Sequence, residues 1–301
     1  MKKIILYILF SIVLTSCGNV TSNDNQMRLS KDERLRLLRA DSLALKIAVM
    51  PTLDCLPIFV AKDCSMYDTA QVDLRLRLFS AQMDCDTAVS GKSVEGFVSD
   101  VVRIGRLNGN GIGLECLSET DAFWQLIANR KARVKRVSQL GDKMVGMTRF
   151  SATDELTDDV LKGVKLSSMV FRIQVNDVNV RLAMLINNEL DAAWLEEPQA
   201  TMARRYGNNV LCDSREMKRK FGAIAFRKDI MGDVYRKKQI KAFAEAYNMA
   251  CDSINKNGLQ HYKNIISKYC KVDGECVALL PKIRYRHIGK SNNADMKVER
   301  K

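Results

Sequence analysis

The chain has 301 residues, a length that fits one large domain or two domains of ordinary size. Hydrophobic residues make up 47% and charged residues 28% of it, and this globular composition excludes a fibrous or wholly disordered protein. The net charge of +13 makes the protein basic, and its two histidines leave little room for a histidine-based triad or a histidine-rich metal site.

The N-terminus has the pattern of an export signal. Met1 to Lys3 is positively charged, and residues 4–13 are apolar apart from Ser11. This run is too short to span a bilayer core of about 30 Å, but it is typical of a signal peptide. It ends in Leu14-Thr15-Ser16-Cys17, which resembles a bacterial lipobox. The resemblance implies cleavage before Cys17 and lipid on its sulfur and amine; the alternative is an ordinary signal peptide in which Cys17 is incidental.

The region after the signal peptide, residues 17–45, is predicted to be a lipid-anchored tether, because two acyl groups hold a protein stably on a membrane. Its first part, 18–26, is small and polar, as in a flexible linker. Its second part, 28–45, carries leucines among charges and predicts a short helix or stalk. No later segment is apolar over the roughly 20 residues that a spanning helix needs.

Three clusters of Lys and Arg, at 130–136, 215–220 and 235–238, raise the question of nucleic-acid binding. No aromatic residues are interleaved with them as a stacking platform. On an exported protein we expect such clusters to face solvent or anionic headgroups. The sequence therefore predicts no nucleic-acid partner.

The chain contains an internal repeat at an offset of about 97 residues. Strand-like segments at 46–50, 74–78 and 94–98 fall, in the same order, on segments at 143–147, 171–175 and 190–194. Each is short and apolar or alternating, which is typical of strands, and patterns typical of helices occupy 83–91 and 178–188. The identities are few, so a chance alignment is the alternative.

Each half of the repeat predicts alternating strands and helices, which favours an α/β fold with two similar lobes, each a mainly parallel sheet with right-handed crossovers. Ligands of such sheets bind beyond the carboxyl ends of the strands, so two facing lobes would form a cleft. Residues 221–226 predict a further strand. Two amphipathic helices follow, with core-facing stripes at Ile240, Phe243, Ala244, Tyr247 and Cys251, and at Leu259, Tyr262, Ile266 and Tyr269.

Four stretches carry a family resemblance. They are an opening strand and ligand loop at 46–57 with a helix at 58–62, a strand of the small–Gly–x–Val–Asp–small kind at 89–100, a strand ending in Glu-Pro at 188–201, and a helix at 242–255. On these stretches, residues 46 to about 285 resemble a periplasmic solute-binding protein of the type II fold. The nearest branch includes the nitrate/sulfonate/taurine and thiamine-precursor binding proteins of ABC importers. Asn187-Asn188, Cys55 and Cys85 depart from the family pattern.

The resemblance implies a division of the chain. Residues 1–16 are the lipoprotein signal peptide, 46–121 and 221–289 form lobe 1, 122–220 form lobe 2, and 290–301 form a polar tail. The chain would cross between lobes near 118–123 and return near 220–226. Without the family, the alternative is two sequential domains split near residue 121, followed by a helical tail.

The function implied is that of a monomeric, lipid-anchored extracytoplasmic protein that delivers a small polar molecule to an ABC permease in the inner membrane. The ligand expected is an amino-heterocycle such as a thiamine precursor, or a sulfonate or amine. The periplasmic side of that membrane is the expected location, and no catalysis, metal or cofactor is expected. Two alternatives stay open. One is a sensor or interaction lipoprotein that does not transport; the other is an enzyme of the thiamine-pyrimidine or menaquinone-pathway type.

The candidate ligand-binding residues follow the predicted strands of both lobes. They are Asp54, Cys55, Gln82, Ser99, Asp100, Arg149, Ser151, Thr153, Asn176, Trp194, Glu196 and Glu197. Several have a second interpretation that stays open at this point. Ser151 to Asp154 can cap a helix or help to hold an anion at its N-terminus, Trp194 can stack on a planar ligand or lie in the core, and the carboxylates can bind ligand or line a solvated rim.

The candidate loops are acidic on balance, with four or five carboxylates against Arg103 and Arg149. Because buried carboxylates need partners, a ligand with donor groups, such as an amino-heterocycle or another amine, fits them better than nitrate or sulfate. Cys270 and Cys276 bracket a turn-like segment, and an exported compartment permits them to pair. No Cys/His zinc spacing occurs.

Overall fold

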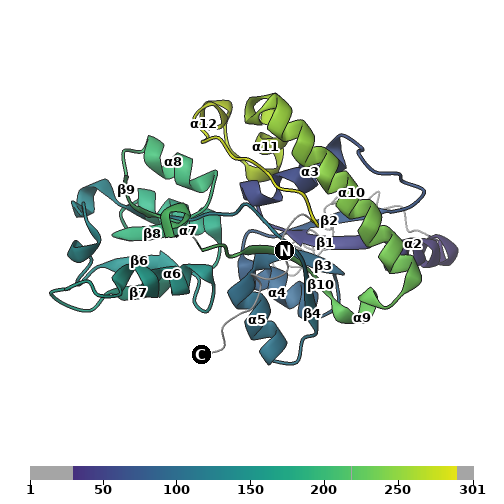
Figure 1. The fold of residues 1–301 in the computed structure, drawn as a ribbon, viewed down its shortest axis with the longest axis horizontal. Helices are drawn as coiled ribbons and strands as arrows, with labels where there is room; N and C mark the ends of the chain where they lie inside the picture. The colour runs from purple at the N-terminus through teal and green to yellow at the C-terminus, as the bar shows by residue number, and fades with distance from the viewer. Residues whose placement is uncertain (1–29, 218, 290–301) are drawn as a thin grey trace, which may run out of the picture. The chain divides into compact units, whose positions relative to one another are not determined.

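A computed structural model describes residues 30–217 and 219–289 (Figure 1). The predicted signal peptide, the predicted lipidation site Cys17, the small polar part of the predicted tether and the predicted C-terminal tail lie outside these residues. Within the described residues, no helix is both long enough and apolar enough to cross a membrane.

The segment before the globular part forms a separate unit that contains helix α2, Lys31–Leu43. The helix begins with a reciprocal cap: the Ser30 hydroxyl accepts from the Glu33 N–H at 3.2 Å, and the Glu33 carboxylate accepts from the Ser30 N–H at 2.8 Å. None of its residues is buried. The predicted short helix in this region is therefore confirmed.

The remainder, from Ala44 onward, forms one compact unit with two sheets. In the first sheet, β1 lies between β2 and β3 and is parallel to both, while β10 is antiparallel to its neighbours β3 and β4. Four of the five strands thus run in one direction. The strands, in sheet order, are β2 Leu74–Leu78, β1 Leu45–Val49, β3 Gly96–Asp100, β10 Gly222–Arg227 and β4 Leu114–Glu119.

The second sheet repeats this arrangement. Strands β7, β6 and β8 are parallel, and β5 is antiparallel to both β8 and β9. Their bounds are β7 Phe171–Gln174, β6 Met144–Met147, β8 Ala192–Leu195, β5 Gln125–Ala128 and β9 Asn209–Asp213. All six strands predicted from the repeat are confirmed, as is the α/β fold with two sheets. The chain passes from the first sheet to the second between β4 and β5, and returns between β9 and β10.

Helices flank both sheets (Figure 1). The longest is α10, Val234–Asn257, whose predicted apolar stripe is buried at Ile240, Phe243 and Tyr247. The second predicted C-terminal helix is instead a 3-10 turn, Leu259–Tyr262, followed by α11, Lys263–Cys270. The others are α3 Leu56–Asp63, α4 Gln82–Ser90, α5 Val101–Gly109, α6 Ala152–Leu161, α7 Val178–Ile186, α8 Gln199–Arg205, α9 Lys228–Met231 and α12 Gly274–Ala278.

Strand β8 shows how the core of the second sheet is built. Successive side chains of a strand point to opposite faces. Ala192 and Trp194 accordingly pack into one apolar cluster, and Ala193 and Leu195 pack into another. Both faces of this strand are covered, and all four residues are buried. The strand ends at Leu195, and Glu196, the next residue, is the first that is not buried.

Candidate functional site

Loops at the carboxyl ends of strands from the two sheets touch one another. The Leu53 N–H, after β1, donates to the Glu197 carbonyl, after β8, at 2.8 Å. Gln199 donates from its side-chain amide to the Pro51 carbonyl at 3.0 Å. These contacts bring together loops that follow β1 and β8, which is the region where ligands of open α/β sheets bind.

A narrow pocket with a volume of about 10 Å³ lies between these loops, so the loops must separate before it can admit anything larger than a water molecule. It is lined by Thr52, Leu53, Asp54, Asp121, Ala122, Phe123, Glu196, Glu197 and Ile283. We call it the acidic pocket, because four of its nine lining residues are carboxylates. Asp121 is held by the Arg286 guanidinium at 2.7 Å, and Glu197 is also engaged within the chain. Asp54 and Glu196 are the two carboxylates left to face a ligand.

Asp54 lies in a 3-10 turn, Leu53–Cys55, directly after β1. The Thr52 hydroxyl donates to one carboxylate oxygen at 2.6 Å, and the Thr120 hydroxyl lies 3.4 Å from the other. Burial raises the pKa of Asp54, and the hydrogen bonds from Thr52, Cys55 and Thr120 oppose that rise. A further hydrogen-bond donor would therefore stabilise the partly desolvated Asp54 carboxylate.

Glu196 follows β8 and is half-buried. Among the described residues, its carboxylate has no hydrogen-bond or ion-pair partner. Burial raises its pKa well above the usual range, the negative charges of Asp54 and Asp100 raise it further, and the Arg181 guanidinium opposes them. Carboxylates that share one site raise one another's pKa in this way. A positively charged ligand group would lower these pKa values again.

Asp100 ends β3 and is almost fully buried. Its carboxylate caps α5 by accepting from the Arg103 N–H at 3.0 Å. Burial raises the pKa of Asp100 to about 6, and the Arg103 N–H, the Arg103 charge and the backbone N–H of Ala152 oppose that rise. Ala152 is the first residue of α6, so the Asp100 carboxylate is influenced by the N-terminus of a helix beside the other sheet.

Arg181, a residue that the sequence analysis did not single out, supplies the opposing charge. Its guanidinium is buried and donates to the Val175 carbonyl, the Trp194 carbonyl and the Thr148 hydroxyl at 2.8–2.9 Å. Burial lowers its pKa to about 10, and Glu196 opposes that fall. Its only sequence signal is a single charge within an apolar helical segment. Its three side-chain hydrogen bonds go to neutral groups, and its positive charge opposes the pKa rise of Glu196.

Three of the predicted ligand residues are structural. Trp194 is fully buried, and its indole N–H donates to the Thr157 hydroxyl at 2.9 Å, so it offers no face for stacking. Cys55 is fully buried in the apolar core of the first sheet, where burial raises the pKa of its thiol well above the usual range. Glu197 is buried and accepts from Thr201 and Arg204 of α8.

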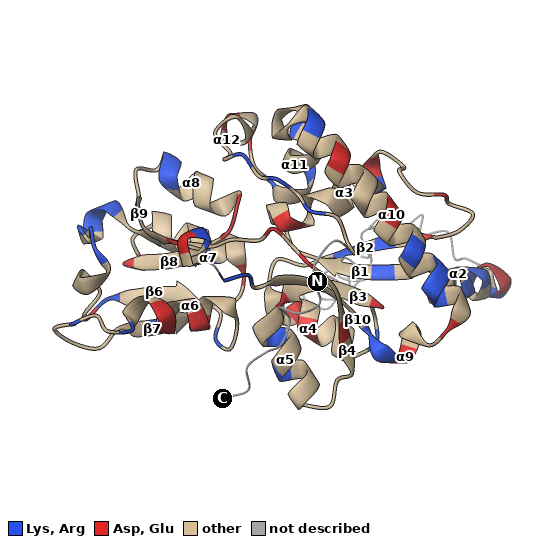
Figure 2. Ribbon diagram, viewed as in Figure 1, with Lys and Arg blue, Asp and Glu red and all other residues tan. Residues whose placement is uncertain are grey.

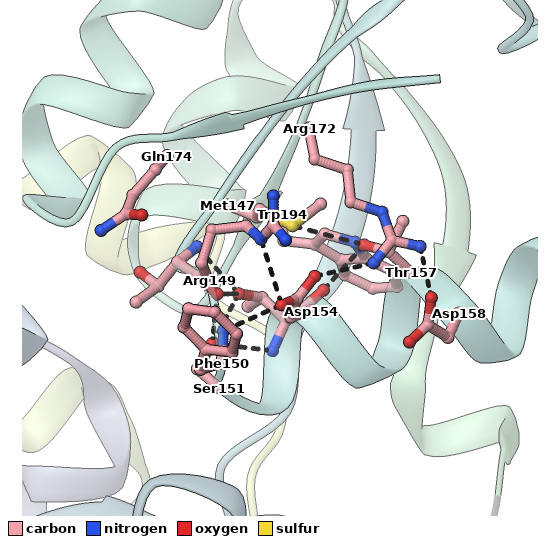
Figure 3. A network of polar contacts seen from close by, with 12 residues as sticks. Met147, Arg149, Phe150, Ser151, Asp154, Thr157, Asp158, Arg172, Gln174 and Trp194 are labelled. Carbon is pink, nitrogen blue, oxygen red and sulfur yellow. Dashed lines mark hydrogen bonds and ion pairs between the residues drawn. The ribbon is translucent and has the colours of Figure 1, made fainter. Parts of the chain in front are cut away.

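The segment at 148–154 forms a helix cap, as one of the two interpretations expected (Figure 3). The Ser151 hydroxyl accepts from the Thr153 N–H at 3.2 Å and donates to the Thr148 carbonyl at 2.7 Å. The Thr153 hydroxyl accepts from the Thr148 N–H at 3.0 Å. Arg149 lies 3.3 Å from the Asp154 carboxylate. These side chains bond within their own loop rather than toward the acidic pocket.

The remaining candidates lie in two further places. The Gln82 amide donates to the Ser99 hydroxyl at 2.9 Å, which joins the loop after β2 to the end of β3. Asn176, after β7, contacts the Met83 sulfur at 2.9 Å. Arg103, next to Ser99 and Asp100, is buried in an ion pair with Asp86, which neutralises its charge. With the Arg103 charge neutralised, the excess of carboxylates over cations expected for the site is larger.

The cysteines and the metal-binding side chains add no further site. The eight cysteines from Cys55 to Cys276 are free thiols, so Cys270 and Cys276 do not form the disulfide for which their spacing made them candidates. Within residues 30–217 and 219–289, no group of three or more His, Cys, Asp or Glu side chains is placed to hold a metal ion.

Comparison with known proteins identifies the fold. No protein-family model matches the chain, and no curated protein matches it. Among solved structures, it is similar to the alkanesulfonate-binding protein SsuA from Xanthomonas axonopodis pv. citri bound to MOPS, with a TM-score of 0.69 and 14% identity over 81% of this chain and 86% of that one.

Two further solved structures are similar. The ligand-binding component of an ABC-type import system from Staphylococcus aureus, with zinc bound, has a TM-score of 0.66 and 14% identity over 78% of this chain and 81% of that one. The periplasmic nitrate-binding protein NrtA from Synechocystis PCC 6803 has a TM-score of 0.65 and 15% identity, over 78% and 68%. The chain thus has the periplasmic-binding-protein fold.

Proposed function

We propose that this protein with the periplasmic-binding-protein fold is an extracytoplasmic solute-binding protein. It holds a small polar molecule in the acidic pocket and delivers it to the permease of an ABC importer. The observation that carries the proposal is the meeting of Asp54 and Glu196, from loops after β1 and β8, in one pocket. Solved structures of ABC-importer binding components with the same fold support it.

The ligand class follows from the charges. Burial raises the pKa values of Asp54, Asp100 and Glu196, the charges of Asp54 and Asp100 raise that of Glu196 further, and Arg181 is the cation that opposes the rise at Glu196. A ligand amine or protonated ring nitrogen would supply donors to these acids and restore their charged form. We therefore propose a small amine or amino-heterocycle, contacted by Asp54 and Glu196, with Asp100, Ser99 and Gln82 behind them.

Release requires the loops to separate. Besides the Leu53–Glu197 and Gln199–Pro51 bonds, Arg205 at the end of α8 pairs with Asp273 and Glu275 at the start of α12 at 2.6–3.0 Å. These exposed ion pairs contribute little free energy each. Opening and closing of two sheets joined by two crossing segments is a hinge motion of the kind that binding proteins use.

The anchoring is part of the same proposal. Lipid on Cys17 would hold the protein at the periplasmic side of the inner membrane, and residues up to α2 would connect the anchor to the globular part. Such an anchor would keep the protein close to a permease that takes up ligand from outside the cytoplasm.

A thermal-shift screen tests the proposal directly. The purified protein is screened against amines, amino-heterocycles including thiamine precursors, amino acids and sulfonates. A ligand that binds only the folded state raises the melting temperature by mass action. We expect stabilisation by a member of the amine or amino-heterocycle groups. Stabilisation by sulfonates alone would contradict the proposed ligand class.

A further inference from the structure

A second concave site adjoins the acidic pocket and has the opposite charge. It lies where the two crossing segments meet the segment that follows α12, and it has a cavity volume of about 460 Å³. Its lining residues are Thr120, Asp121, Ala122, Phe123, Ser214, Arg215, Arg219, Lys220, Lys282, Ile283, Arg284 and Arg286. We call it the basic groove. Small-molecule sites usually have volumes of roughly 300–1,000 Å³.

Four of the six cations of the basic groove have acidic partners. Arg215 pairs with Asp213 at 2.6 Å, Lys220 with Glu119 at 3.3 Å and Arg286 with Asp121 at 2.7 Å. Arg219 pairs with Glu155 at 2.6 Å and also with Asp159. The charges of these four are therefore largely balanced by the chain itself.

Lys282 and Arg284 differ from the other four. Both are exposed, and neither has a hydrogen bond or ion pair within the part of the chain that the structure describes. Exposure alternates along this segment, because Ile283 is half-buried against the acidic pocket and Tyr285 is buried with its hydroxyl on the Leu53 carbonyl at 2.8 Å. The buried residues thus fix the side from which Lys282 and Arg284 enter the groove. Figure 2 shows basic positions recurring along this segment.

The groove also contains an aromatic ring against which one of its arginines packs. The Arg215 guanidinium lies 4.0 Å from the centre of the Phe123 ring, and its ion pair with Asp213 is bidentate. Phe123 itself is buried. A stacked and paired arginine is held in place, so it offers its remaining N–H groups in a fixed direction.

We propose that the basic groove binds a small oxyanion with at least two negative charges, such as a diphosphate or phosphate monoester. Lys282 and Arg284 supply the unbalanced positive charge, and Arg215 supplies preorganised donors beside them. The N–H groups of an arginine guanidinium can bond two oxygens of one phosphate group. Two cations without an acidic partner in the chain would balance two negative charges of the ligand. The basic groove adjoins the acidic pocket but is a different site. The carboxylates of the acidic pocket make that pocket unsuitable for an anion.

Calorimetric titration of the purified full chain with inorganic pyrophosphate at constant ionic strength tests this site. The variant Lys282→Gln/Arg284→Gln removes the unpaired charges without touching an ion pair. The matched control Lys237→Gln/Lys238→Gln removes two exposed positive charges from α10. We expect at least tenfold weaker binding in the first variant, since each lost charge-assisted hydrogen bond alone accounts for about a tenfold change or more, and binding within twofold of wild type in the control.

Two results would overturn the proposal: no binding of pyrophosphate by the wild type, or equal weakening in both variants. A short-chain soluble phosphatidate, titrated against the same proteins, separates two sources of the phosphate group. Binding tighter than that of pyrophosphate and lost in Lys282→Gln/Arg284→Gln assigns the groove to a lipid headgroup, and weaker binding assigns it to a free anion. The titration with pyrophosphate needs no ligand of the acidic pocket, so its outcome and that of the proposed function are read separately.

Discussion

Ser80 and Asp177 are equivalent residues of the internal repeat, 97 positions apart, and they are hydrogen-bonded to each other. Ser80 follows β2, and Asp177 follows the equivalent strand β7. The Val178 N–H also donates to the Ser80 carbonyl at 3.0 Å, and Ala81 forms a β-bridge with Asp177. The equivalent loops of the repeat, after β2 and after β7, are therefore in direct contact with each other and join the two sheets.

This contact predicts unequal effects of two substitutions. Asp177 also caps α7, accepting from the Asn179 and Val180 N–H groups at 2.8 and 3.0 Å. Ser80→Ala removes only the bond between the loops, whereas Asp177→Ala removes that bond and the cap. We expect Asp177→Ala to lower the free energy of unfolding by about 1 kcal/mol more than Ser80→Ala. Urea unfolding measures both, and equal losses would contradict the described cap.

The position of Trp194 predicts a stability effect rather than a binding effect. Replacing a fully buried tryptophan by alanine costs about 3–5 kcal/mol. The milder Trp194→Phe keeps the packing and loses the bond to Thr157. We expect Trp194→Phe to lower the free energy of unfolding while ligand affinity changes by less than threefold. A large loss of affinity with unchanged stability would instead indicate a stacking role.

The buried acids predict that stability falls as pH rises from 5 to 7.5. The pKa of Asp100 is about 6 in the folded protein and 3.8 in its reference state, so the folded state holds a proton that the unfolded chain has released. The stabilisation that protonated Asp100 gives the folded state is complete below pH 3.8 and is lost as pH rises through about 6. Between pH 5 and 7.5 the free energy of unfolding falls by about 1 kcal/mol from this residue. The raised pKa values of Asp54 and Glu196 act in the same direction.

The variant Asp100→Asn isolates the contribution of this residue, because asparagine keeps an oxygen for the Arg103 N–H but does not titrate. We expect the difference in unfolding free energy between pH 5 and pH 7.5 to shrink by about 1 kcal/mol in the variant. Denaturant unfolding at both pH values measures it. An unchanged difference would show that Asp100 does not titrate in this range.

The anchor is tested by metabolic labelling. Because Leu14 to Cys17 resembles a lipobox, Cys17→Ser is expected to abolish incorporation of labelled fatty acid and to leave the protein unprocessed or released from the membrane. Cys64→Ser, at an exposed cysteine of the globular part, is the matched control and is expected to keep the label. Equal labelling of both variants would contradict lipidation at Cys17.

The strands could be predicted from the sequence because each is a short apolar segment that recurs in order in the second half. The orientation of Trp194 could not, since both faces of β8 are buried and alternation gives no indication of which face meets a ligand. The cap at Ser151 was one of two open interpretations. That the N-terminus of α6 meets Asp100, 52 residues earlier, depends on how the two sheets come together. Arg181 was missed for the same reason, since its partners come from three separate segments.

The most direct test of the account is the affinity of the best ligand from the thermal-shift screen for wild type, Asp54→Asn, Glu196→Gln and the exposed control Glu189→Gln. A charge-assisted hydrogen bond contributes about 1.5–3 kcal/mol, which corresponds to roughly a tenfold to hundredfold change in affinity. We predict at least tenfold weaker binding for Asp54→Asn and Glu196→Gln, and binding within twofold of wild type for Glu189→Gln. If all three variants bind within twofold of wild type, the ligand does not bind in the acidic pocket.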